Sequence, residues 1–263
     1  RGYKEFDFVD DNFTLSKERA LQICELIKQN NLVGLNLKCG NGIRADRTDR
    51  ELLKKMKESG FTYLAFGVES GNNRILRRIK KAENLEKIEQ AIKNSVQLGF
   101  YVGLFFMIGH PEETEKEVED SFNLALKYPV FHVLFYNALP YPGTELFEYI
   151  KTNNLLIKDP KVYLKNISYY DNEPVYATKE FPAEKRREML AKAKQVQDEV
   201  LRKSMLRSLA RYGILGRFAA PLISPLILDP TGSSTSWRLM QSKKFKKSIF
   251  YLAQMLNFGP VLW

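Results

Sequence analysis

Short apolar runs alternate with longer amphipathic stretches over residues 1–150. The apolar runs have the length of strands, and the stretches between them carry apolar residues at helical spacing. One strand and one helix recur about every 30 residues, which is typical of βαβ units in a parallel sheet. The pattern predicts strands at Glu5–Val9, Leu32–Leu37, Phe61–Phe66, Tyr101–Ile108 and Val130–Tyr136.

Helix-start signals lie between these strands. Thr and Asn side chains accept hydrogen bonds from the free N–H groups of a first turn, and a Glu three residues after a Thr completes a capping box. The pairs Thr48–Glu51 and Thr114–Glu117 have that spacing. Helices are therefore predicted to begin near Thr14, Thr48, Asn84 and Thr114, the first with an apolar stripe formed by Leu15, Ile23, Leu26 and Ile27.

This alternation predicts an α/β fold, a partial (β/α) barrel, because right-handed crossovers curl successive parallel units around one axis. Polar and glycine-rich residues follow the strands, at the ends where barrels bind ligands. Five such ends on one face predict a binding site, although polar loops can also do no more than turn the chain. We expect the barrel at residues 1–150, an irregular connector with a strand near Lys165–Tyr170 at residues 151–181, and a mainly helical extension at residues 182–263.

The C-terminal extension is strongly basic. From Ala183 onward the chain carries 15 Lys and Arg against 5 Asp and Glu, which accounts for the whole net charge of +10. The run Phe218–Leu228 is too short to span a bilayer, but the basic amphipathic segment Trp237–Leu256 suits a membrane surface. A helical cap on the barrel is the alternative, and nucleic acid is disfavoured because no stacking motif accompanies the charges. A long helix is predicted from Pro182 to about Arg211, with Met189, Ala193, Val196, Val200 and Leu206 on one face.

Composition narrows the class of protein. A chain of 263 residues, 44% of them hydrophobic, can bury a sizeable core, and it contains no apolar run long enough for a membrane-spanning helix. Cys24 and Cys39 make no disulfide framework, which favours a cytoplasmic location, peripheral to the membrane if the tail binds there. Two thiols alone cannot hold a metal cluster, which needs about three or four protein ligands. The chain begins with Arg1 rather than Met, so we expect a fragment or a processed form.

Several polar residues at the strand ends have two interpretations. Asp10 and Asp11 either accept from a ligand amine or cap the next helix. Arg44 either forks a carboxylate or pairs with Asp46. Glu69 lies between glycines directly after a strand, where a buried carboxylate needs a donor, and for this residue a ligand role is favoured.

The aromatic, histidine and thiol side chains are also ambiguous. Tyr136 and Asn137 either stack on and hydrogen-bond a purine or only pack. His110 could be a general base, but beside a proline it is expected to be a loop histidine. His132, inside an apolar strand, is expected in the core, and Cys39 is expected to be a buried thiol rather than a nucleophile.

Five short motifs follow one another along the chain. They are Phe8-Val-Asp-Asp-Asn-Phe-Thr14, Asn41-Gly-Ile-Arg-Ala-Asp46, Gly67-Val-Glu-Ser-Gly71, Phe106-Met-Ile-Gly-His-Pro-Glu-Glu-Thr114 and Pro140-Tyr-Pro-Gly-Thr-Glu145. In order and spacing they resemble radical S-adenosylmethionine (radical SAM) enzymes, and most closely the branch that often carries an upstream cobalamin-binding domain. Each motif is weak by itself, but five in order make the resemblance specific over roughly residues 1–150.

The resemblance implies a partial barrel of six strands that this chain enters at the second strand. It also implies a binding site for S-adenosylmethionine at the carboxyl ends of the strands. By position in the motifs, the amino group would be held by Asp10 or Asp11, and the ribose or methionyl part would be contacted by Glu69 and Ser70. The adenine would lie against Ile108, Gly109 and the residues to Glu113, with further backbone contacts from Tyr136, Asn137 and Ala138. The same cavity would be faced by Arg44.

Three further groups are implied by the resemblance: a 4Fe–4S cluster held by a CxxxCxxC motif after the first strand, an electron donor such as flavodoxin or ferredoxin, and cobalamin from an upstream domain. This sequence has no CxxxCxxC motif, and Cys24 and Cys39 lie too far apart to replace it. We therefore expect the cluster ligands upstream of Arg1, no metal ligands within the chain, and no radical chemistry from the chain by itself.

The leading functional hypothesis is the C-terminal part of a radical SAM enzyme. Such an enzyme cleaves S-adenosylmethionine reductively and then methylates, cyclises or rearranges its substrate, here an unknown small or lipid-like molecule. One alternative is a cluster-free barrel that binds a nucleotide-like ligand or a partner. Another is an ordinary barrel enzyme that uses carboxylates such as Asp10 and Glu69 for acid–base catalysis.

Overall fold

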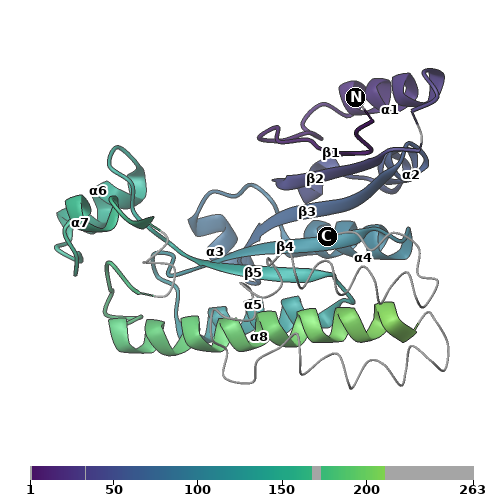
Figure 1. The fold of residues 1–263 in the computed structure, drawn as a ribbon. Helices are drawn as coiled ribbons and strands as arrows, with labels where there is room; N and C mark the ends of the chain where they lie inside the picture. Colours follow the sequence, from purple (N-terminus) through teal and green to yellow (C-terminus); the bar gives the residue numbers. More distant parts are fainter. Residues whose placement is uncertain (1, 33, 168–172, 211–263) are drawn as a thin grey trace. The chain divides into compact units, whose positions relative to one another are not determined.

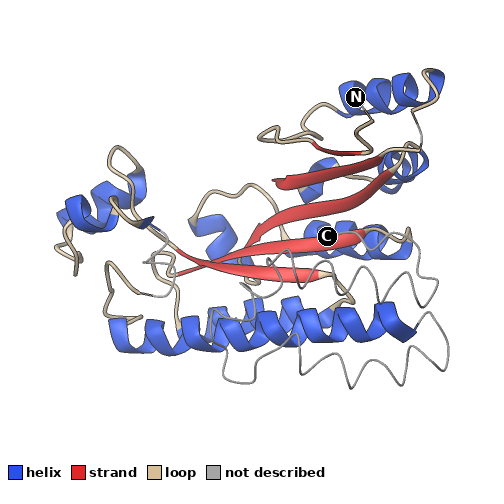
Figure 2. Ribbon diagram, in the orientation of Figure 1, coloured by secondary structure: helices blue, strands red, loops and turns tan. Residues whose placement is uncertain are grey.

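Five parallel strands form the sheet at the centre of the fold (Figures 1 and 2). The computed structural model describes residues 2–32, 34–167 and 173–210. Within these residues the strands pair in chain order, as right-handed crossovers produce, and the predicted α/β half-barrel is confirmed. The strands are β1 (Glu5–Asp7), β2 (Asn36–Ile43), β3 (Phe61–Glu69), β4 (Tyr101–Ile108) and β5 (His132–Asn137).

Helices follow each strand. The sheet belongs to the first of two compact units, Arg1–Leu201 and Arg202–Trp263, and the last helix described continues into the second. The helices are α1 (Lys17–Gln29), the 3-10 helix η1 (Ala45–Arg47), α2 (Arg50–Glu58), α3 (Asn73–Arg78), α4 (Leu85–Gln97), α5 (Glu115–Lys127), α6 (Glu145–Thr152), α7 (Pro160–Tyr163) and α8 (Ala183–Ala210).

The sheet buries one face under helices and turns the other toward a cavity. In β4, the side chains of Val102, Leu104 and Phe106 are buried in the hydrophobic core. The alternate residues Phe105 and Met107 line a pocket on the other face. Successive strand residues point to opposite faces, so a single strand supplies both layers. Burial of each large apolar side chain contributes about 1.5–3 kcal/mol, which makes the helix-covered face the stabilising one.

The caps predicted at Asn84 and Thr114 are confirmed. The Asn84 side chain accepts a hydrogen bond from the Lys87 N–H at 3.0 Å, and α4 follows it. Thr114 and Glu117 form the complete capping box at the start of α5. Two free donors of that helix are thus satisfied locally, directly after the carboxyl end of β4.

The caps predicted at Thr14 and Thr48 are wrong by two residues and one residue. Ser16 caps α1 by accepting from the Arg19 N–H at 3.1 Å, and Asp49 caps α2 by accepting from the Leu52 N–H at 2.8 Å. The Thr48 hydroxyl instead donates to the Ala45 carbonyl at 2.9 Å and so closes η1. Where two capping residues lie close together, the turn before the helix decides between them.

The apolar face of α1 also differs from the prediction. Ala20, Cys24 and Ile27 are buried, whereas Leu15 and Leu26 are exposed. The Cys24 carbonyl accepts a hydrogen bond at 3.1 Å from the hydroxyl of Ser59, which ends α2, so the buried face of α1 lies toward α2.

The strand β2 lies further along the chain than the predicted Leu32–Leu37, with which it shares only Asn36 and Leu37, and β3 is longer than predicted. β2 starts at Asn36 and continues through Cys39 to Ile43, because both side chains are buried and pair with β3 across an irregularity in the register. β3 continues to Glu69, which pairs with Phe106 of β4. Polar and glycine residues within these extensions led to the prediction of loops.

The stretch expected to be an irregular connector contains ordered elements. Helix α6 ends within it, α7 lies inside it, and an antiparallel bridge joins Leu156 and Tyr176. Of the strand expected near Lys165–Tyr170, residues 165–167 form no strand, and residues 168–170 lie outside the described residues. The short helices α3 and α6 were not predicted, because neither is long enough for a periodic pattern.

The long C-terminal helix is confirmed as α8, and its first part packs on the barrel. Leu190, Ala193, Val196 and Val200 are buried on one face, as α8 runs beside α5 (Figure 1). The Gln197 side chain accepts a hydrogen bond from the Phe135 N–H at 2.8 Å, which satisfies a backbone donor on the edge strand β5. None of the described helices is long and apolar enough to cross a membrane. The segments 218–228 and 237–256 lie outside the described residues.

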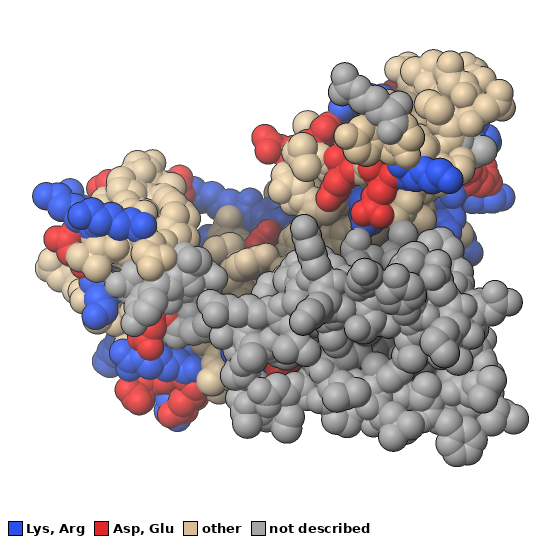
Figure 3. Space-filling view, viewed as in Figure 1, with Lys and Arg blue, Asp and Glu red and all other residues tan. Residues whose placement is uncertain are grey.

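The surface of the described residues is electrostatically mixed. On the face in Figure 3, Lys and Arg side chains lie interspersed with Asp and Glu side chains. Many form exposed ion pairs, such as Lys17 with Asp49 and Glu51. Each such pair contributes only about 0–1 kcal/mol, so the fold depends on the apolar core rather than on these contacts.

We predict that Gly71→Ala destabilises the fold. A Cβ atom at Gly71 would lie 2.5 Å from the Asp120 carbonyl oxygen and 2.6 Å from the Ser121 Cα, both in the backbone of α5. Neither atom can yield alone, so we expect the free energy of unfolding to fall by about 1–3 kcal/mol in urea titrations. Gly34→Ala is the matched control, because nothing lies within 4 Å of its added Cβ. Equal stability of the two variants would contradict the close packing of α5 on this turn.

Candidate functional site

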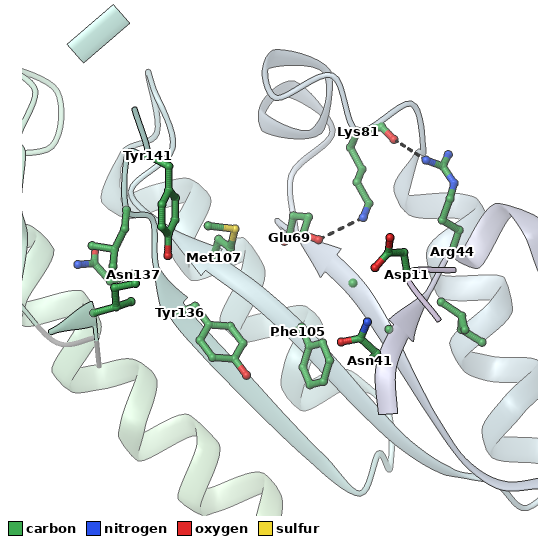
Figure 4. Close-up of a pocket in the computed structure, with 15 residues that line it drawn as sticks. Asp11, Asn41, Arg44, Glu69, Lys81, Phe105, Met107, Tyr136, Asn137 and Tyr141 are labelled. Atoms are coloured by element: carbon green, nitrogen blue, oxygen red, sulfur yellow. Dashed lines mark hydrogen bonds and ion pairs between the residues drawn. The ribbon is translucent and has the colours of Figure 1, made fainter. Parts of the chain in front are cut away.

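A pocket of about 420 Å³ opens at the carboxyl ends of β2 to β5 (Figure 4). This volume lies within the range of about 300–1,000 Å³ that small-molecule sites occupy. Its position agrees with the expectation that polar strand ends converge on one face. The lining residues are Asp11, Asn41, Gly42, Ile43, Arg44, Gly67, Glu69, Lys81, Phe105, Met107, Tyr136, Asn137, Leu139, Tyr141 and Ile167.

Glu69 and Lys81 form an ion pair in the charged half of the pocket. The Lys81 ammonium lies 3.2 Å from the Glu69 carboxylate, and the two side chains are 18% and 23% exposed. Glu69 ends β3 with a φ of 66°, and Lys81 lies between Lys80 and Ala82, whose φ values are 56° and 57°. Residues other than glycine adopt this conformation at a cost of about 1–3 kcal/mol each, and such strain concentrates at functional sites.

A buried carboxylate holds the loop that carries Lys81. Glu83 accepts from the Asp46 N–H at 3.2 Å and lies 3.8 Å from the Lys81 ammonium. Arg44 binds both carboxylate oxygens of Asp46, at 2.9 and 3.0 Å, and donates to the Lys81 carbonyl at 3.4 Å. Burial raises the pKa of the Glu83 carboxyl. Arg44 therefore pairs with Asp46, one of the two alternatives, and still lines the pocket.

The opposite half of the pocket is aromatic and apolar. Phe105 and Met107 project from β4, and Tyr136 from β5 lies edge-on to Phe105 with ring centroids 6.1 Å apart. Leu139 and Tyr141 follow β5 and complete this wall. In Figure 4, Tyr136 and Tyr141 lie on the opposite side of the view from Arg44 and Lys81, with Phe105 and Met107 between them. A ligand with one charged end and one flat, weakly polar end matches such a division.

Glu113 occupies the backbone donors of the turn after β4. Its carboxylate accepts from the Gly109 N–H at 2.6 Å and from the His110 N–H at 3.2 Å. Burial raises the pKa of Glu113 to about 7, although these two hydrogen bonds lower it. The side chain of His110 is buried as well, and burial lowers its pKa to about 4. The second carboxylate oxygen of Glu113 and the Nε2 atom of His110 have no hydrogen-bond partner among the described residues, and neither residue belongs to the pocket lining.

The structure brings some of the predicted site residues together and places the others elsewhere. Asp11, Arg44, Glu69, Tyr136 and Asn137 line the pocket. Asp10 pairs with Arg19 at 2.6 Å, and Ser70 is buried and accepts from the Asn72 N–H. The pocket lining does not include Ile108, Gly109 or Glu113, which lie with Asp10 and Ser70 outside it.

The sequence interpretation missed Lys81, Asn41, Phe105, Met107 and Tyr141. Phe105 and Met107 could have been found, because they alternate with the core positions of β4. Lys81 carries no sequence signal, since it follows another lysine in a polar loop.

The thiol of Cys39 is buried, as the sequence predicted. His132 is partly buried and hydrogen-bonds the Tyr63 hydroxyl at 2.8 Å.

Comparison with known proteins identifies the fold's family. Residues 1–125 match the family described as the Radical SAM superfamily. This part of the chain belongs to the Radical SAM superfamily. The five motifs noted in the sequence lie largely within this radical SAM segment, which extends from β1 into α5.

Two curated relatives of this chain are methyltransferases by name. One, described as an uncharacterized methyltransferase from Pyrococcus horikoshii, is 36% identical over 192 residues, covering 73% of this chain and 40% of the relative. The other is the cytidylyl-2-hydroxyethylphosphonate methyltransferase of Streptomyces wedmorensis, 33% identical over 175 residues, covering 64% of this chain and 32% of the relative. The chain thus spans less than half the length of either.

A solved radical SAM structure has the same fold. The radical S-adenosylmethionine methyltransferase TsrM from Kitasatospora setae, with cobalamin and a [4Fe-4S] cluster bound, superposes with a TM-score of 0.52. The match covers 60% of this chain and 32% of TsrM at 17% sequence identity. This similarity concerns the architecture of the half-barrel.

The described residues do not fit a 4Fe–4S cluster. No group of three or more His, Cys, Asp or Glu side chains within residues 2–32, 34–167 and 173–210 is placed to hold a metal ion. Cys24 in α1 and Cys39 in β2 are both buried in the apolar core, away from the pocket lining. Burial raises the pKa of the Cys39 thiol far above its usual range, so it remains protonated.

We predict that Glu113→Gln changes the pH dependence of stability. Burial raises the pKa of Glu113 from 4.5 to about 7, so between these values the folded state holds the proton more tightly than the unfolded state. The contribution of this carboxyl to stability therefore falls as the pH rises through that window. Relative to the wild type, Glu113→Gln should gain about 3 kcal/mol of unfolding free energy across it.

Urea unfolding of both proteins at the two ends of the pH window measures this difference. The depressed pKa values of His110 and His132 act in the opposite direction, because their contribution rises with pH, but they are common to both proteins. A difference in stability that is independent of pH would mean that Glu113 is ionised normally in the fold.

Proposed function

We propose that this chain forms the S-adenosylmethionine-binding half-barrel of a radical SAM methyltransferase. The observation that carries the proposal is the divided pocket at the strand ends, with Glu69 and Lys81 on one side and the aromatic wall on the other. The methyltransferase assignment is supported by the names of the two curated relatives. Reaction and substrate belong to the whole protein and remain part of the proposal.

The lining residues fit S-adenosylmethionine in both size and chemistry. This molecule joins a zwitterionic amino acid to an adenosine through a positively charged sulfur. The charged half of the pocket offers a cation at Lys81 and acceptors at Glu69 and Asp11, while Phe105 and Tyr136 offer flat faces for a purine. Aromatic faces also tolerate a nearby cation, which suits a sulfonium between the two halves.

Within this proposal each half of the pocket orients one end of the ligand. Lys81 would bind the ligand carboxylate, and Glu69 would accept from its ammonium group or a ribose hydroxyl. Arg44 and Glu83 would hold the Lys81 loop in place through the contacts already described. When bound, S-adenosylmethionine supplies a methyl group, or the adenosyl part, for transfer chemistry. The pocket's own contribution is to fix the direction in which the ligand points.

The cluster, the electron donor and cobalamin stay predictions for this chain. No described residues fit the cluster, so no role is assigned to it here. The acid–base alternative named Asp10 and Glu69 as candidate carboxylates. Asp10 is paired with Arg19 and is not part of the pocket lining, and Glu69 is paired with Lys81, so the two carboxylates do not face a common reacting group.

We predict that the full chain binds S-adenosylhomocysteine, a stable analogue, and that Lys81→Met weakens this binding. Loss of a charge-assisted hydrogen bond costs about 1.5–3 kcal/mol, equivalent to roughly tenfold to hundredfold in Kd by isothermal titration calorimetry. Lys80→Met is the matched control, because this neighbour pairs with Glu145 at 2.6 Å and is not part of the pocket lining. Absence of binding by the wild type would overturn the proposed function, and equal loss in both variants would overturn the role of Lys81.

A further inference from the structure

Arg186 is a buried cation with no carboxylate in direct ion-pair contact among the described residues. It lies near the start of α8, its side chain is 1% exposed, and it is the largest side chain in the fully buried set. It forms no ion pair with any of the described residues, and its Nε atom has no hydrogen-bond partner among them. A nearby opposite charge is the buried carboxyl of Glu113, whose pKa burial raises and Arg186 lowers, but the two form no ion pair within 4 Å. A buried charge without a direct partner is costly, so dipoles must solvate this arginine.

Backbone carbonyls supply those dipoles. One terminal nitrogen of Arg186 donates to the carbonyls of Ile108 at 3.2 Å and Ala138 at 3.0 Å, and to the side-chain oxygen of Asn137 at 2.7 Å. The other donates to the Tyr176 carbonyl at 3.1 Å. Ile108 and Asn137 are the last residues of β4 and β5, so a single guanidinium joins the carboxyl ends of two neighbouring strands.

The guanidinium lies between an aromatic ring and a glycine. Its carbon is 4.2 Å from the centre of the Tyr176 ring, and the Tyr176 hydroxyl donates to the Gly109 carbonyl. A Cβ atom at Gly109 would lie 1.9 Å from the guanidinium carbon, so only glycine leaves room for Arg186 there. The arginine, the tyrosine and the glycine turn therefore form one packed unit behind the pocket.

This unit holds a wall of the pocket through Asn137. The Asn137 side chain accepts from Arg186 at one end and donates to the Glu173 carbonyl at 2.9 Å at the other, so its orientation is set from outside the cavity. Asn137 and Leu139 line the pocket on either side of Ala138, whose carbonyl Arg186 also binds. Apolar packing alone would not fix the orientation of the Asn137 side chain, because the hydrophobic effect is not directional.

We infer that Arg186 is a positioning residue that fixes the aromatic half of the pocket and thereby its affinity for the adenosyl part of the ligand. The affinity part of this inference rests on the proposed function, but the structural part does not. It makes the segment from Glu173 to Arg186 a component of the binding site although neither end residue lines the cavity.

The test compares Arg186→Met and Tyr176→Phe with Lys192→Met in the full chain. The Tyr176 variant removes only the hydroxyl bond to Gly109, so it remains informative if the arginine variant fails to fold. Lys192 lies on the same helix but pairs on the surface with Glu119. Hydrogen exchange read by mass spectrometry follows the amides of residues 104–114 and 134–140, with those of residues 61–68 in β3 as the internal reference.

We expect amide protection at the ends of β4 and β5 to fall about tenfold or more in Arg186→Met, to fall less in Tyr176→Phe, and to stay unchanged in β3 and in Lys192→Met. Protection that is lost evenly across the sheet, or that does not change, would overturn the inference. In calorimetry, Arg186→Met should weaken S-adenosylhomocysteine binding about tenfold, and unchanged affinity would overturn its link to the ligand. If the wild type binds no S-adenosylhomocysteine, the proposed function fails, and the exchange data still decide whether Arg186 holds the wall.

Discussion

The parallel pairing of β2 to β5 is the constraint on which the rest of the structure depends. Parallel strands place all their carboxyl ends at one edge, and the two-residue period of each strand separates the face under the helices from the face toward the cavity. Glu69, Met107 and Asn137 come from far apart in the sequence, yet the register of β3, β4 and β5 brings them to the same pocket. A helix in place of any one strand would remove a wall of the site.

Glycines on this scaffold make room for polar side chains. A Cβ atom at Gly67 would lie 2.9 Å from the Glu69 carboxylate, and one at Gly103 or Gly109 would overlap the Tyr63 hydroxyl or the Arg186 guanidinium. Each polar group is thus placed by the absence of a side chain opposite it. This arrangement lets the sheet carry charged and hydrogen-bonding groups close to its backbone, where larger residues would force them toward solvent.

Much of the fold was predictable, because it depends on patterns that repeat. The run Tyr101–Ile108 and the capping box at Thr114 are local signals, and the structure contains both. Charged residues that act through tertiary contacts gave weaker signals. Lys81 looks like any loop lysine, and its pairing with Glu69 depends on the left-handed turns around it. Arg186 does lie at helical spacing from buried Leu190 and Ala193, so its position on the apolar face was readable, but its carbonyl partners were not.

The turn behind the pocket shows how the fold accommodates two buried ionisable groups, Arg186 and Glu113, without a direct ion pair between them. Arg186 is surrounded by carbonyl oxygens at the ends of β4 and β5, and Glu113 by N–H groups at Gly109 and His110. The positive group thus binds carbonyl oxygens and the negative group binds N–H groups. Both kinds of backbone group are available because they lie where a strand ends and have no partner within regular secondary structure. Because these dipoles have fixed directions, the electrostatic cost of burial is lowest in only one arrangement of strand ends and turn. The hydrogen bonds that offset the cost of burying Arg186 therefore also fix the relative positions of the strand ends that form the pocket wall. Apolar contacts between the same elements would not fix these positions, because they are not directional.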